Sequence, residues 1–420
     1  MNPFRKGYAF LRVVVKFTEK KIIPEINIGL VGHVDHGKTS LTQALTGKWT
    51  DTHSEELKRG ITIRLGYADA TFYYCNNCKR YGTTPKCSAC FEECKPKRAV
   101  SFVDAPGHET LMATLLSGTA LMEGALLVIA ANERCPQPQT AEHLKALDIA
   151  GIKNIVIAQN KIDIVSEEEA RKNYEEIKQF VKGTVAENAP IIPISSIHNA
   201  NIDALVEAIE TTIKTPERDL TKDPRFYIAW SFDVNKPGTA IEKLQGGVLG
   251  GSLTQGTLRV NDEIEIKPGI KLNDKWHPLE GKIVEMIESG VKLDEAKPGG
   301  LIAVRTELDP SLTKGSGLTG SIASTKGKLP ETLHNLDLEV TLFDYVIGIS
   351  GNQSVEKIKK NDKLMITAAI AKTVGVVTSS KKSKIQVALG LPVCAEKSSK
   401  VAISKQVGGR WHLIGWGKIL

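Results

Sequence analysis

An eight-residue run near the start of the chain has the glycine and lysine spacing of a phosphate-binding loop. The pattern G-x-x-x-x-G-K-[ST] is matched by GHVDHGKT at residues 32–39. The run follows a predicted strand at 26–31 and opens an amphipathic stretch that begins at Lys38. Glycines let successive backbone N–H groups face anionic oxygens, Lys38 can reach the β- and γ-phosphates, and the Thr39 hydroxyl is a ligand for Mg²⁺. The run predicts a nucleotide site; the alternative is a glycine-rich turn before an ordinary helix.

Three residues farther along the chain can complete this site. Asp104 follows a predicted strand at 100–103, where a carboxylate can hold the Mg²⁺ shell, although it could instead cap the next helix. Gly107 gives a hinge whose N–H can sense a γ-phosphate. Thr62 lies between the loop and Asp104, where a mobile segment can offer Mg²⁺ a second hydroxyl, and a strand threonine is an equal interpretation of this residue.

The run NKID at residues 160–163 follows a predicted strand at 155–158 and can recognise a guanine base. The carboxylate of Asp163 can accept both N1–H and the N2 amino group of guanine, and adenine lacks both donors there. The alternative is a helix cap ahead of Ser166. Residues 195–197 follow the last predicted strand and can offer backbone N–H groups to the guanine carbonyl. The sequence therefore predicts a preference for GTP over ATP.

Cysteines gather in one short segment. The chain has seven, and five of them fall between Cys75 and Cys94. Cys75 and Cys78 form one C-x-x-C pair, and Cys87 and Cys90 form another, a spacing typical of a tetrahedral four-thiolate zinc knuckle. Buried or oxidised cysteines are the alternative, and Cys94 could replace Cys90 as a ligand.

The elements that must position these residues differ between the two halves of the chain. In the first half, short apolar runs alternate with amphipathic helical patterns, which predicts parallel strands with crossover helices. The predicted strands are 26–31, 100–103, 125–131, 155–158 and 191–194, and the predicted helices are 38–46, 109–118, 139–149, 167–181 and 202–213.

After Pro216 the sequence contains strand-like runs separated by Gly and Pro, which is typical of small barrels or sandwiches. We expect an α/β P-loop GTPase domain with an inserted zinc knuckle, followed by two all-β barrel domains. The expected boundaries are an N-terminal extension at 1–24, the GTP-binding domain at 25–215 with its knuckle at 75–94, and barrels at 216–330 and 331–420.

Composition narrows the class of protein. The 420 residues are 41% hydrophobic and 25% charged with a net charge of +7, an ordinary globular balance that permits a nucleic-acid partner without requiring one. The longest apolar run, at 125–131, is far shorter than a membrane span, and Arg12 and Lys16 interrupt the only stretch resembling a signal peptide. We therefore expect a cytoplasmic protein with no membrane partner.

The motifs together resemble translational GTPases of the elongation factor Tu group. The resemblance rests on residues 31–39, on RGITI at 59–63, on DAPGHE at 104–109 and on NKID at 160–163. More narrowly, the chain resembles the family of gamma subunits of archaeal and eukaryotic translation initiation factor two. That resemblance rests on SEELKRG at 54–60, SFDVNKPG at 231–238, AKPGG at 296–300, LDPSLT at 308–313 and GRW at 409–411, and it covers the chain after about Pro24.

The resemblance implies a role for each matching residue. It implies His108 beside the attacking water. It implies Mg²⁺ held by Thr39, Thr62 and Asp104, with a second Mg²⁺ on Asp35 and the Gly60 carbonyl. The residues that it assigns to GTP are Asp35, His36, Gly37, Lys38, Thr39, Ser40, Gly107, Asn160, Lys161, Asp163, Ser195, Ser196 and Ile197. Ser196 and Ile197 stand where alanine and leucine are usual, a change that backbone-mediated contacts tolerate.

The function that the resemblance implies is a GTP-dependent switch. Such a protein binds initiator methionyl-tRNA, delivers it to the small ribosomal subunit, hydrolyses GTP to GDP and works as a heterotrimer with alpha and beta subunits. An elongation-type or selenocysteine-specific tRNA-carrying GTPase is the alternative within the class. Two alternatives lie outside this class of protein. One is a metabolic GTPase subunit, such as that of sulfate adenylyltransferase, and the other is a zinc-dependent RNA-binding scaffold. The intact nucleotide motifs argue against the scaffold.

Overall fold

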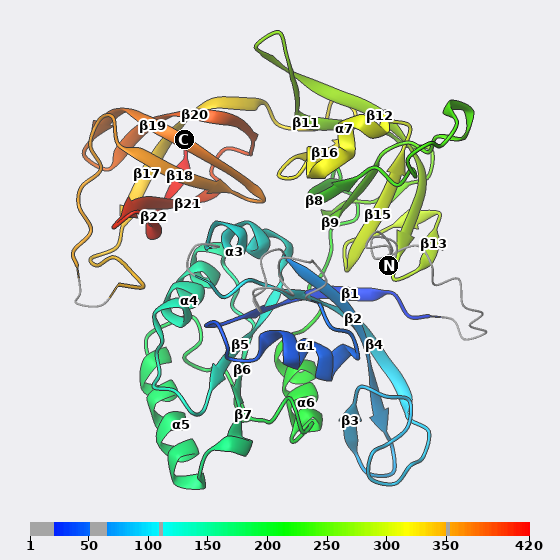
Figure 1. Cartoon of the computed structure of the whole chain (residues 1–420), viewed down its shortest axis with the longest axis vertical. Helices are drawn as coiled ribbons and strands as arrows, with labels where there is room; N and C mark the ends of the chain where they lie inside the picture. The colour runs from blue at the N-terminus through cyan, green and yellow to red at the C-terminus, as the bar shows by residue number, and fades with distance from the viewer. Residues whose placement is uncertain (1–20, 51–64, 109–111, 350–352) are drawn as a thin grey trace.

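A seven-stranded sheet forms the centre of the GTPase domain. The computed structural model describes residues 21–50, 65–108, 112–349 and 353–420, and Figure 1 shows this domain beneath two β-rich domains. The strands of the sheet lie in the order β3-β2-β4-β1-β5-β6-β7. Their bounds are β1 Pro24–Val31, β2 Gly66–Cys75, β3 Arg80–Gly82, β4 Lys95–Asp104, β5 Gly124–Ala130, β6 Ile155–Asn160 and β7 Ile191–Pro193.

Five of the seven strands are the predicted parallel set, and two were not predicted. β4, β1, β5, β6 and β7 pair in parallel, as the strand–helix alternation indicated. β2 and β3 add an antiparallel edge, with β2 paired to β4 along its length. β2 alternates buried and half-buried side chains rather than forming a continuous apolar run, so a search for fully buried strands misses it.

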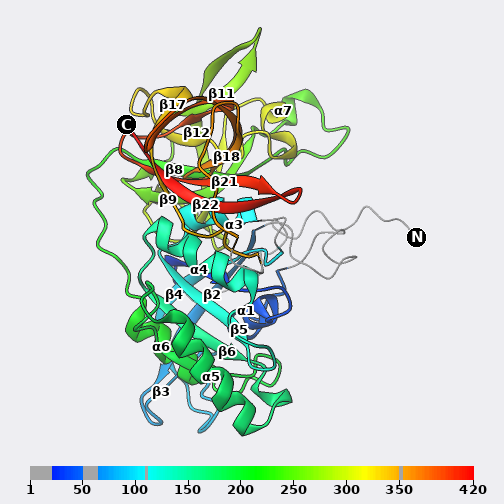
Figure 2. The ribbon, with the colours of Figure 1, turned by 90° about the vertical axis from the view of Figure 1, so that its left-hand side faces the viewer.

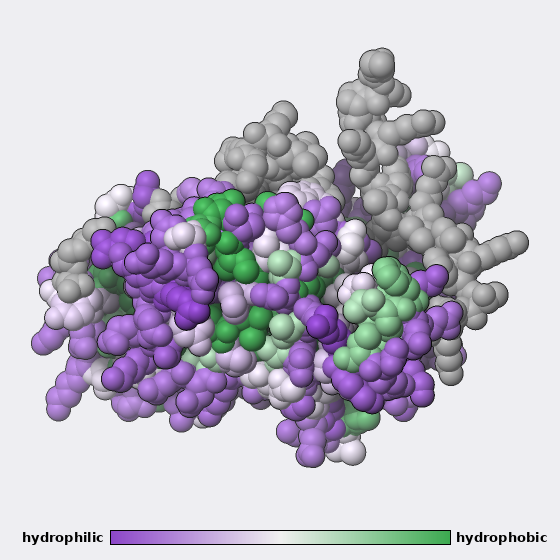
Figure 3. Space-filling view, turned by 90° about the horizontal axis from the view of Figure 1, so that it is seen from below, coloured by the Kyte–Doolittle hydropathy of each residue, from purple (hydrophilic) through white to green (hydrophobic). Residues whose placement is uncertain are grey.

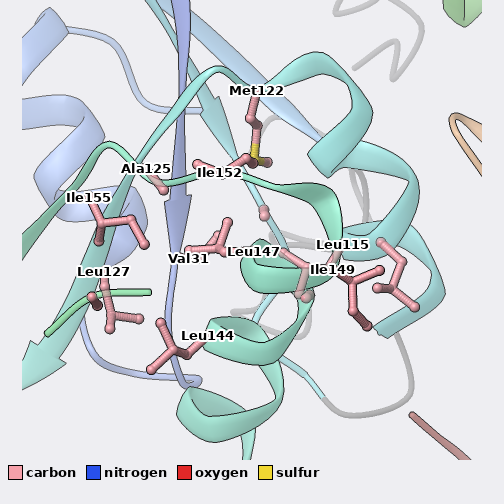
Figure 4. Close-up of a cluster of buried hydrophobic side chains, with 14 of the residues drawn as sticks. Val31, Leu115, Met122, Ala125, Leu127, Leu144, Leu147, Ile149, Ile152 and Ile155 are labelled. Carbon is pink, nitrogen blue, oxygen red and sulfur yellow. The ribbon is translucent and has the colours of Figure 1, made fainter. Parts of the chain in front are cut away.

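Helices cover both faces of the sheet and enclose two cores. The described helices are α1 Lys38–Thr46, α3 Met112–Gly118, α4 Pro138–Ala150, α5 Glu167–Val181 and α6 Ile202–Thr212. The bounds of α1 and α5 coincide with the predicted ones. α1 and α6 pack over one face, while α3, α4 and α5 pack over the other, where Leu115, Leu144 and Leu147 meet Val31 and Leu127 of the sheet (Figure 4).

The two C-terminal domains are six-stranded barrels. The first barrel closes because β11 pairs with β12 at the ends of the order β11-β16-β8-β9-β15-β12, and β13 adds to β12. The second barrel closes in the order β17-β20-β19-β18-β21-β22. The elements of the first barrel are β8 Arg225–Phe232, β9 Val248–Gln255, β10 Leu258–Arg259, β11 Glu263–Leu272, β12 Lys275–Glu288, β13 Val291–Leu293, β14 Glu295–Ala296, β15 Leu301–Thr306, α7 Pro310–Thr313 and β16 Ile322–Thr325. The strands of the second barrel are β17 Thr332–Leu342, β18 Lys363–Ala368, β19 Ala371–Lys381, β20 Lys384–Cys394, β21 Lys400–Val407 and β22 Arg410–Ile419.

One strand-like run in the second barrel, residues 363–371, belongs to two strands. Residues 363–371 contain the whole of β18, a tight turn and the first residue of β19. Ala369 has φ of 49°, a left-handed conformation that reverses the chain between the paired residues Ala368 and Ala371. An apolar run that continues through a turn carries no sign of the reversal in its composition.

The first barrel meets the GTPase domain through buried and half-buried polar groups. Asn27 of β1 donates its side-chain amide to Ser252 at 2.9 Å, and Asp69 of β2 accepts hydrogen bonds from Ser101 at 2.6 Å and Ser289 at 2.5 Å. Glu288 accepts from the backbone N–H of Gly300, and burial together with the nearby charge of Asp69 raises the pKa of Glu288 to about 8.

The lower surface of the GTPase domain is mostly hydrophilic, with hydrophobic residues confined to limited areas (Figure 3). Figure 2 shows α5 and α6 at this end of the molecule, with both barrels at the other. Among the described residues, no helix combines the length and the apolar character needed to cross a membrane.

Candidate nucleotide and metal sites

The phosphate-binding loop connects β1 to α1 through backbone conformations that glycine favours. Gly32 has φ of 143°, and a Cβ added there would lie 2.2 Å from the carbonyl oxygen of Val128. Gly37 has φ of 89°, and its Cβ would lie 2.4 Å from the amide nitrogen of Asn160. Larger residues at these positions would push the loop off the sheet, so the two glycines let the loop lie close against β5 and β6.

The side chain of Lys38 turns back into the phosphate loop. Its Nζ donates to the carbonyl of Gly32 at 3.0 Å and to that of His33 at 2.7 Å. Gly107, which follows Asp104 by three residues, packs against this ammonium group, because a Cβ there would lie 2.4 Å from Nζ. The ammonium group and the Gly107 backbone, both predicted to meet the γ-phosphate, are therefore adjacent.

His36 points into the protein and not out of the loop. Its Nδ1 lies 3.1 Å from the carbonyl oxygen of Val128, and burial lowers the pKa of this imidazole to about 3, so it is neutral at physiological pH. Its backbone carbonyl accepts a hydrogen bond from Asn160 at 2.9 Å. His36 thus contributes to the loop through its backbone and through its packing.

Hydroxyl and carboxylate oxygens converge where Mg²⁺ is expected. Thr39 Oγ1 donates to Asp104 Oδ2 at 2.9 Å, and Thr50 Oγ1 donates to the same oxygen at 2.7 Å. Such oxygen donors fit Mg²⁺, which prefers carboxylate, hydroxyl and water oxygens. Asp35 is exposed at the tip of the loop with φ of 61°. Gly60 and Thr62, the other predicted Mg²⁺ ligands, lie outside the described residues.

Asn160 joins the phosphate loop to the predicted guanine loop. Besides donating to His36, it accepts the backbone N–H of Ser196 at 3.0 Å through its Oδ1. Lys161 has φ of 64°, and Asp163 lies in the 3₁₀ turn Ile162–Ile164. The residues predicted to recognise the base are thereby fixed to the loop predicted to hold the phosphates.

Asp163 is not the cap of the following helix. Ser166 caps α5 itself, accepting the N–H of Glu169, while the Glu169 side chain accepts the N–H of Ser166. The Asp163 side chain is 20% exposed and lies 3.8 Å from the imidazole of His198, so it is accessible to a ligand. Ser195 and Ser196 are buried, and Ile197 is 71% exposed.

His108 directly follows Gly107 and is partly buried. This position puts it next to the Lys38 end of the phosphate loop, the end at which a terminal phosphate would lie. Ser40 follows Thr39 in the first turn of α1.

Two residues of this site were not predicted. Thr50 completes the pair of hydroxyls on Asp104, and His143 of α4 accepts the backbone N–H of Gly32 at 2.8 Å through Nδ1. From sequence alone, a histidine on a largely apolar helix face cannot be distinguished from a residue that only packs in the core. A threonine in a connecting segment gives no signal either.

The four predicted cysteine ligands come together. Their sulfur atoms all lie within 4.8 Å of one another, and those of Cys75 and Cys90 are 3.5 Å apart. Tetrahedral Zn²⁺ with Zn–S bonds of about 2.3 Å places its sulfurs roughly 3.8 Å apart, so this group fits zinc. A disulfide would need about 2.05 Å. Cys94 stands outside the group, which favours Cys90 as the fourth ligand.

Local backbone geometry shapes the cluster for a metal. The residue after each C-x-x-C pair is left-handed, Lys79 with φ of 54° and Phe91 with φ of 62°. The backbone N–H groups of Cys90 and Ala89 point at the Cys87 sulfur and lower the pKa of that thiol to about 6. Because Zn²⁺ binds thiolates, these N–H groups favour the form that the metal needs.

The cysteine cluster and the nucleotide site occupy opposite ends of one strand pair. β2 and β4 pair from Gly66 with Asp104 at the nucleotide end to Tyr74 with Lys95 at the cysteine end. Nine residue steps at about 3.3 Å each separate the ends by roughly 30 Å. Figure 1 shows the β3 end at the bottom of the molecule, away from the barrels.

Two family models match separate parts of the chain. The "Elongation factor Tu GTP binding domain" matches residues 24–215, and "Initiation factor eIF2 gamma, C terminal" matches residues 334–419.

Similar proteins match nearly the whole chain. The chain is 57% identical to the translation initiation factor 2 subunit gamma of Archaeoglobus fulgidus, a match covering 100% of this chain and 99% of that protein. Identity to the protein of the same name from Pyrococcus horikoshii is also 57%, covering 94% and 97%.

Solved structures share the fold at low sequence identity. A bacterial selenocysteine-specific elongation factor superposes with a TM-score of 0.71 at 24% identity, covering 95% of this chain and 58% of that one. Translation elongation factor SelB of Methanococcus maripaludis, in complex with a GTP analogue, gives 0.70 at 21%, covering 95% and 80%.

Proposed function

The chain belongs to the family of translation initiation factor 2 gamma subunits, and we propose that in its GTP-bound state it binds initiator methionyl-tRNA and delivers it to the small ribosomal subunit. It is a translational GTPase with an initiation-factor role. The observation that supports tRNA delivery best is the 57% identity that extends through both barrels and not only through the GTPase domain.

We assign the nucleotide to the loop described above. Asp35 to Ser40 and Gly107 would bind phosphates, and Asn160, Lys161, Asp163 and residues 195–197 would bind guanine. Thr39, Thr62 and Asp104 would hold Mg²⁺, with Asp35 and Gly60 at a second ion. Bound Mg²⁺ neutralises charge that develops on the phosphates. Buried donors and the Lys38 ammonium orient the phosphate chain, and His108 would position water for attack.

The contacts between domains indicate how the nucleotide would control tRNA. β2 begins at Gly66, close after Thr62, and its Asp69 contacts the first barrel through Ser289. Leu121, which follows α3, packs in one apolar cluster with Ala229 of the first barrel and Ile370 of the second. A γ-phosphate that orders Thr62 and Gly107 would therefore change the seating of both barrels and the groove for the tRNA acceptor end.

The remaining assignments follow from family membership. We propose that the chain is the core of a heterotrimer with alpha and beta subunits, that it works in the cytoplasm, and that the cysteine cluster holds a structural zinc. We also keep the division into an extension at 1–24, a GTPase domain at 25–215 and barrels at 216–330 and 331–420.

The alternative of an elongation-type or selenocysteine-specific carrier is less well supported. The bacterial selenocysteine-specific elongation factor and elongation factor SelB share the fold at 24% and 21% identity, whereas the initiation-factor subunit of Archaeoglobus fulgidus is 57% identical. A shared fold at this low identity does not indicate which tRNA the protein binds.

The test is tRNA binding by the trimer reconstituted with alpha and beta subunits. We expect tight binding of initiator methionyl-tRNA with a GTP analogue, weaker binding with GDP or elongator methionyl-tRNA, and affinity that falls with salt because phosphates are contacted. Thr62→Ala should lower tRNA affinity more than GTP affinity, and Thr211→Ala, at an exposed threonine of α6, should change neither. Equal tRNA affinity in both nucleotide states, or no preference for initiator tRNA, would contradict the proposal.

A further inference from the structure

Helix α4 lies between the phosphate loop and the second barrel. Leu144 and Leu147 pack in the core beneath it, as Figure 4 shows. Ala402 of β21 and Leu413 of β22 belong to the same buried cluster, so the second barrel and the GTPase domain share a core across this helix. Movement of the barrel would therefore be transmitted to α4.

Glu142 of α4 is held by the second barrel. Its side chain is buried, with the residue only 1% exposed, and its Oε1 lies 3.2 Å from Nδ1 of His412 on β22. Gly348 of the same barrel closes over this carboxylate, since a Cβ there would lie 2.5 Å from Oε1. His412 is also buried. A buried carboxylate stabilised by a hydrogen-bonding partner fixes the position of the residue that carries it.

The next residue, His143, is held by the phosphate loop. It is 1% exposed, and its Nδ1 accepts the backbone N–H of Gly32 at 2.8 Å. Burial, followed by the charges of Lys38, His33 and His36, puts the pKa of His143 well below its ordinary value. The imidazole is therefore neutral and keeps the lone pair that Gly32 needs.

We propose that Glu142 and His143 form a two-residue link through which the seating of the second barrel on α4 sets the hold on the phosphate loop, and thereby the rate at which nucleotide leaves. Neighbouring residues of a helix point about 100° apart, so one turn of α4 can face the barrel and the loop at once. A small shift of this turn would lengthen the 2.8 Å hydrogen bond between the Gly32 N–H and His143. The φ of Gly32, 143°, depends on the contacts around it.

His412 is the positioning residue in this link, and His143 is the group that touches the loop. The link goes beyond tRNA delivery, because it predicts that the barrel influences nucleotide in the absence of tRNA and of the other subunits. It can therefore fail while the proposed tRNA function stands, and the reverse is also true.

The experiment measures dissociation of fluorescent GDP from the full chain. His143→Leu removes the acceptor and leaves the Gly32 N–H buried without a partner, so dissociation should accelerate about tenfold. His143→Asn places an amide oxygen near the position of Nδ1 and should stay within about twofold of the unaltered protein. His412→Ala should accelerate dissociation about fivefold, the lower end of the usual range for coupling between sites.

The double variant distinguishes a link from two separate effects. If His412 acts through His143, His143→Leu/His412→Ala should release GDP no faster than His143→Leu alone. Lys145→Met is the matched control, because Lys145 of α4 also contacts the second barrel, 5.2 Å above the Phe343 ring, without touching the loop. It should leave the rate unchanged.

Three results would overturn the proposal. These are an unchanged rate in His412→Ala, rates that multiply in the double variant, or an equal acceleration in Lys145→Met. Thermal unfolding of each variant, measured in parallel, ensures that every rate comes from folded protein. If His143→Leu does not fold, the comparison of His412→Ala with Lys145→Met still decides the question.

Discussion

The two ends of β4 carry two sites built in opposite ways. At the Lys95 end, the four cysteines come from one segment of sixteen residues, 75–90, and two local turns shape the cluster. At the Asp104 end, the site draws on residues from Gly32 to Ser196, supplied by the carboxyl ends of four strands and by helices α1 and α4. The first site is local in sequence, whereas the second exists only when the sheet is assembled.

This difference implies different sources of stability. The nucleotide end is enclosed by the two cores of the GTPase domain, which hold Asn160, Asp104 and His143 buried. The cysteine end exposes Phe91 to 77% and has few buried apolar side chains besides Cys75 and Cys87. We therefore expect the cysteine end to depend on its metal and the nucleotide end to depend on packing.

Zinc removal should produce the largest effect and should be confined to one end. Metal analysis should find about one zinc per chain, and Cys75→Ser should lose it, because structural zinc contributes roughly 10–16 kcal/mol to the folding of small metal sites. The measurement is zinc content together with amide hydrogen exchange of residues 75–94. GTP affinity should stay within about twofold, since roughly 30 Å separates the ends.

Cys94→Ser is the control for this variant, because Cys94 lies outside the four-sulfur group; it should keep the metal. A native protein without zinc would contradict the metal assignment. A large loss of GTP affinity in Cys75→Ser would instead show that the two ends are coupled.

The next effect concerns the chemical step at the nucleotide end. His108→Ala should slow GTP cleavage about 100-fold, because positioning of water acts mainly in the transition state, while GTP affinity should change less than about twofold. Single-turnover hydrolysis measures the cleavage rate, and equilibrium nucleotide binding measures the GTP affinity. His334→Ala, at an exposed histidine of β17, should cleave GTP at the unaltered rate. If His108→Ala cleaved GTP at the unaltered rate, His108 would have only a structural role.

The smallest of the three effects concerns the base. Asp163→Asn should weaken GTP binding roughly tenfold or more, since hydrogen bonds to a charged group contribute about 1.5–3 kcal/mol each. The amide should also favour xanthosine nucleotides, because it can donate where the carboxylate accepts. Equilibrium titration with GTP and XTP measures both, and equal GTP affinity would remove Asp163 from the base site.

The same contrast explains which features the sequence could predict. The sequence could predict that the four cysteines come together, because both C-x-x-C pairs lie in one short segment and no distant residue has to join them. The sequence could predict that the phosphate loop, Asp104 and Asn160 meet, because each lies at the carboxyl end of a strand of a parallel sheet. Thr50 and His143 could not be predicted, because their roles depend on which distant atoms they meet.

Strands with irregular burial were the main elements missed in the fold. β2 and the long β12 have alternating or irregular burial, and Gly415 and Gly417 interrupt the apolar sequence of β22, although most of its residues are buried. Their neighbours in the sheets, and not their own apolar content, make them strands. The central strands β1, β5 and β6 are almost entirely buried, so a continuous apolar run was sufficient to predict them.

One contact at the boundary between the GTPase domain and the first barrel gives the protein an optical reporter. Tyr67 of β2 meets the indole of Trp230 on β8 edge to face, with ring centroids 5.4 Å apart. At this spacing light absorbed by the phenol passes efficiently to the indole, and the partly buried indole emits at shorter wavelength than one in water. Separation of the barrel from the sheet would reduce that transfer and shift the emission to the red, so domain docking can be followed in solution without an attached dye.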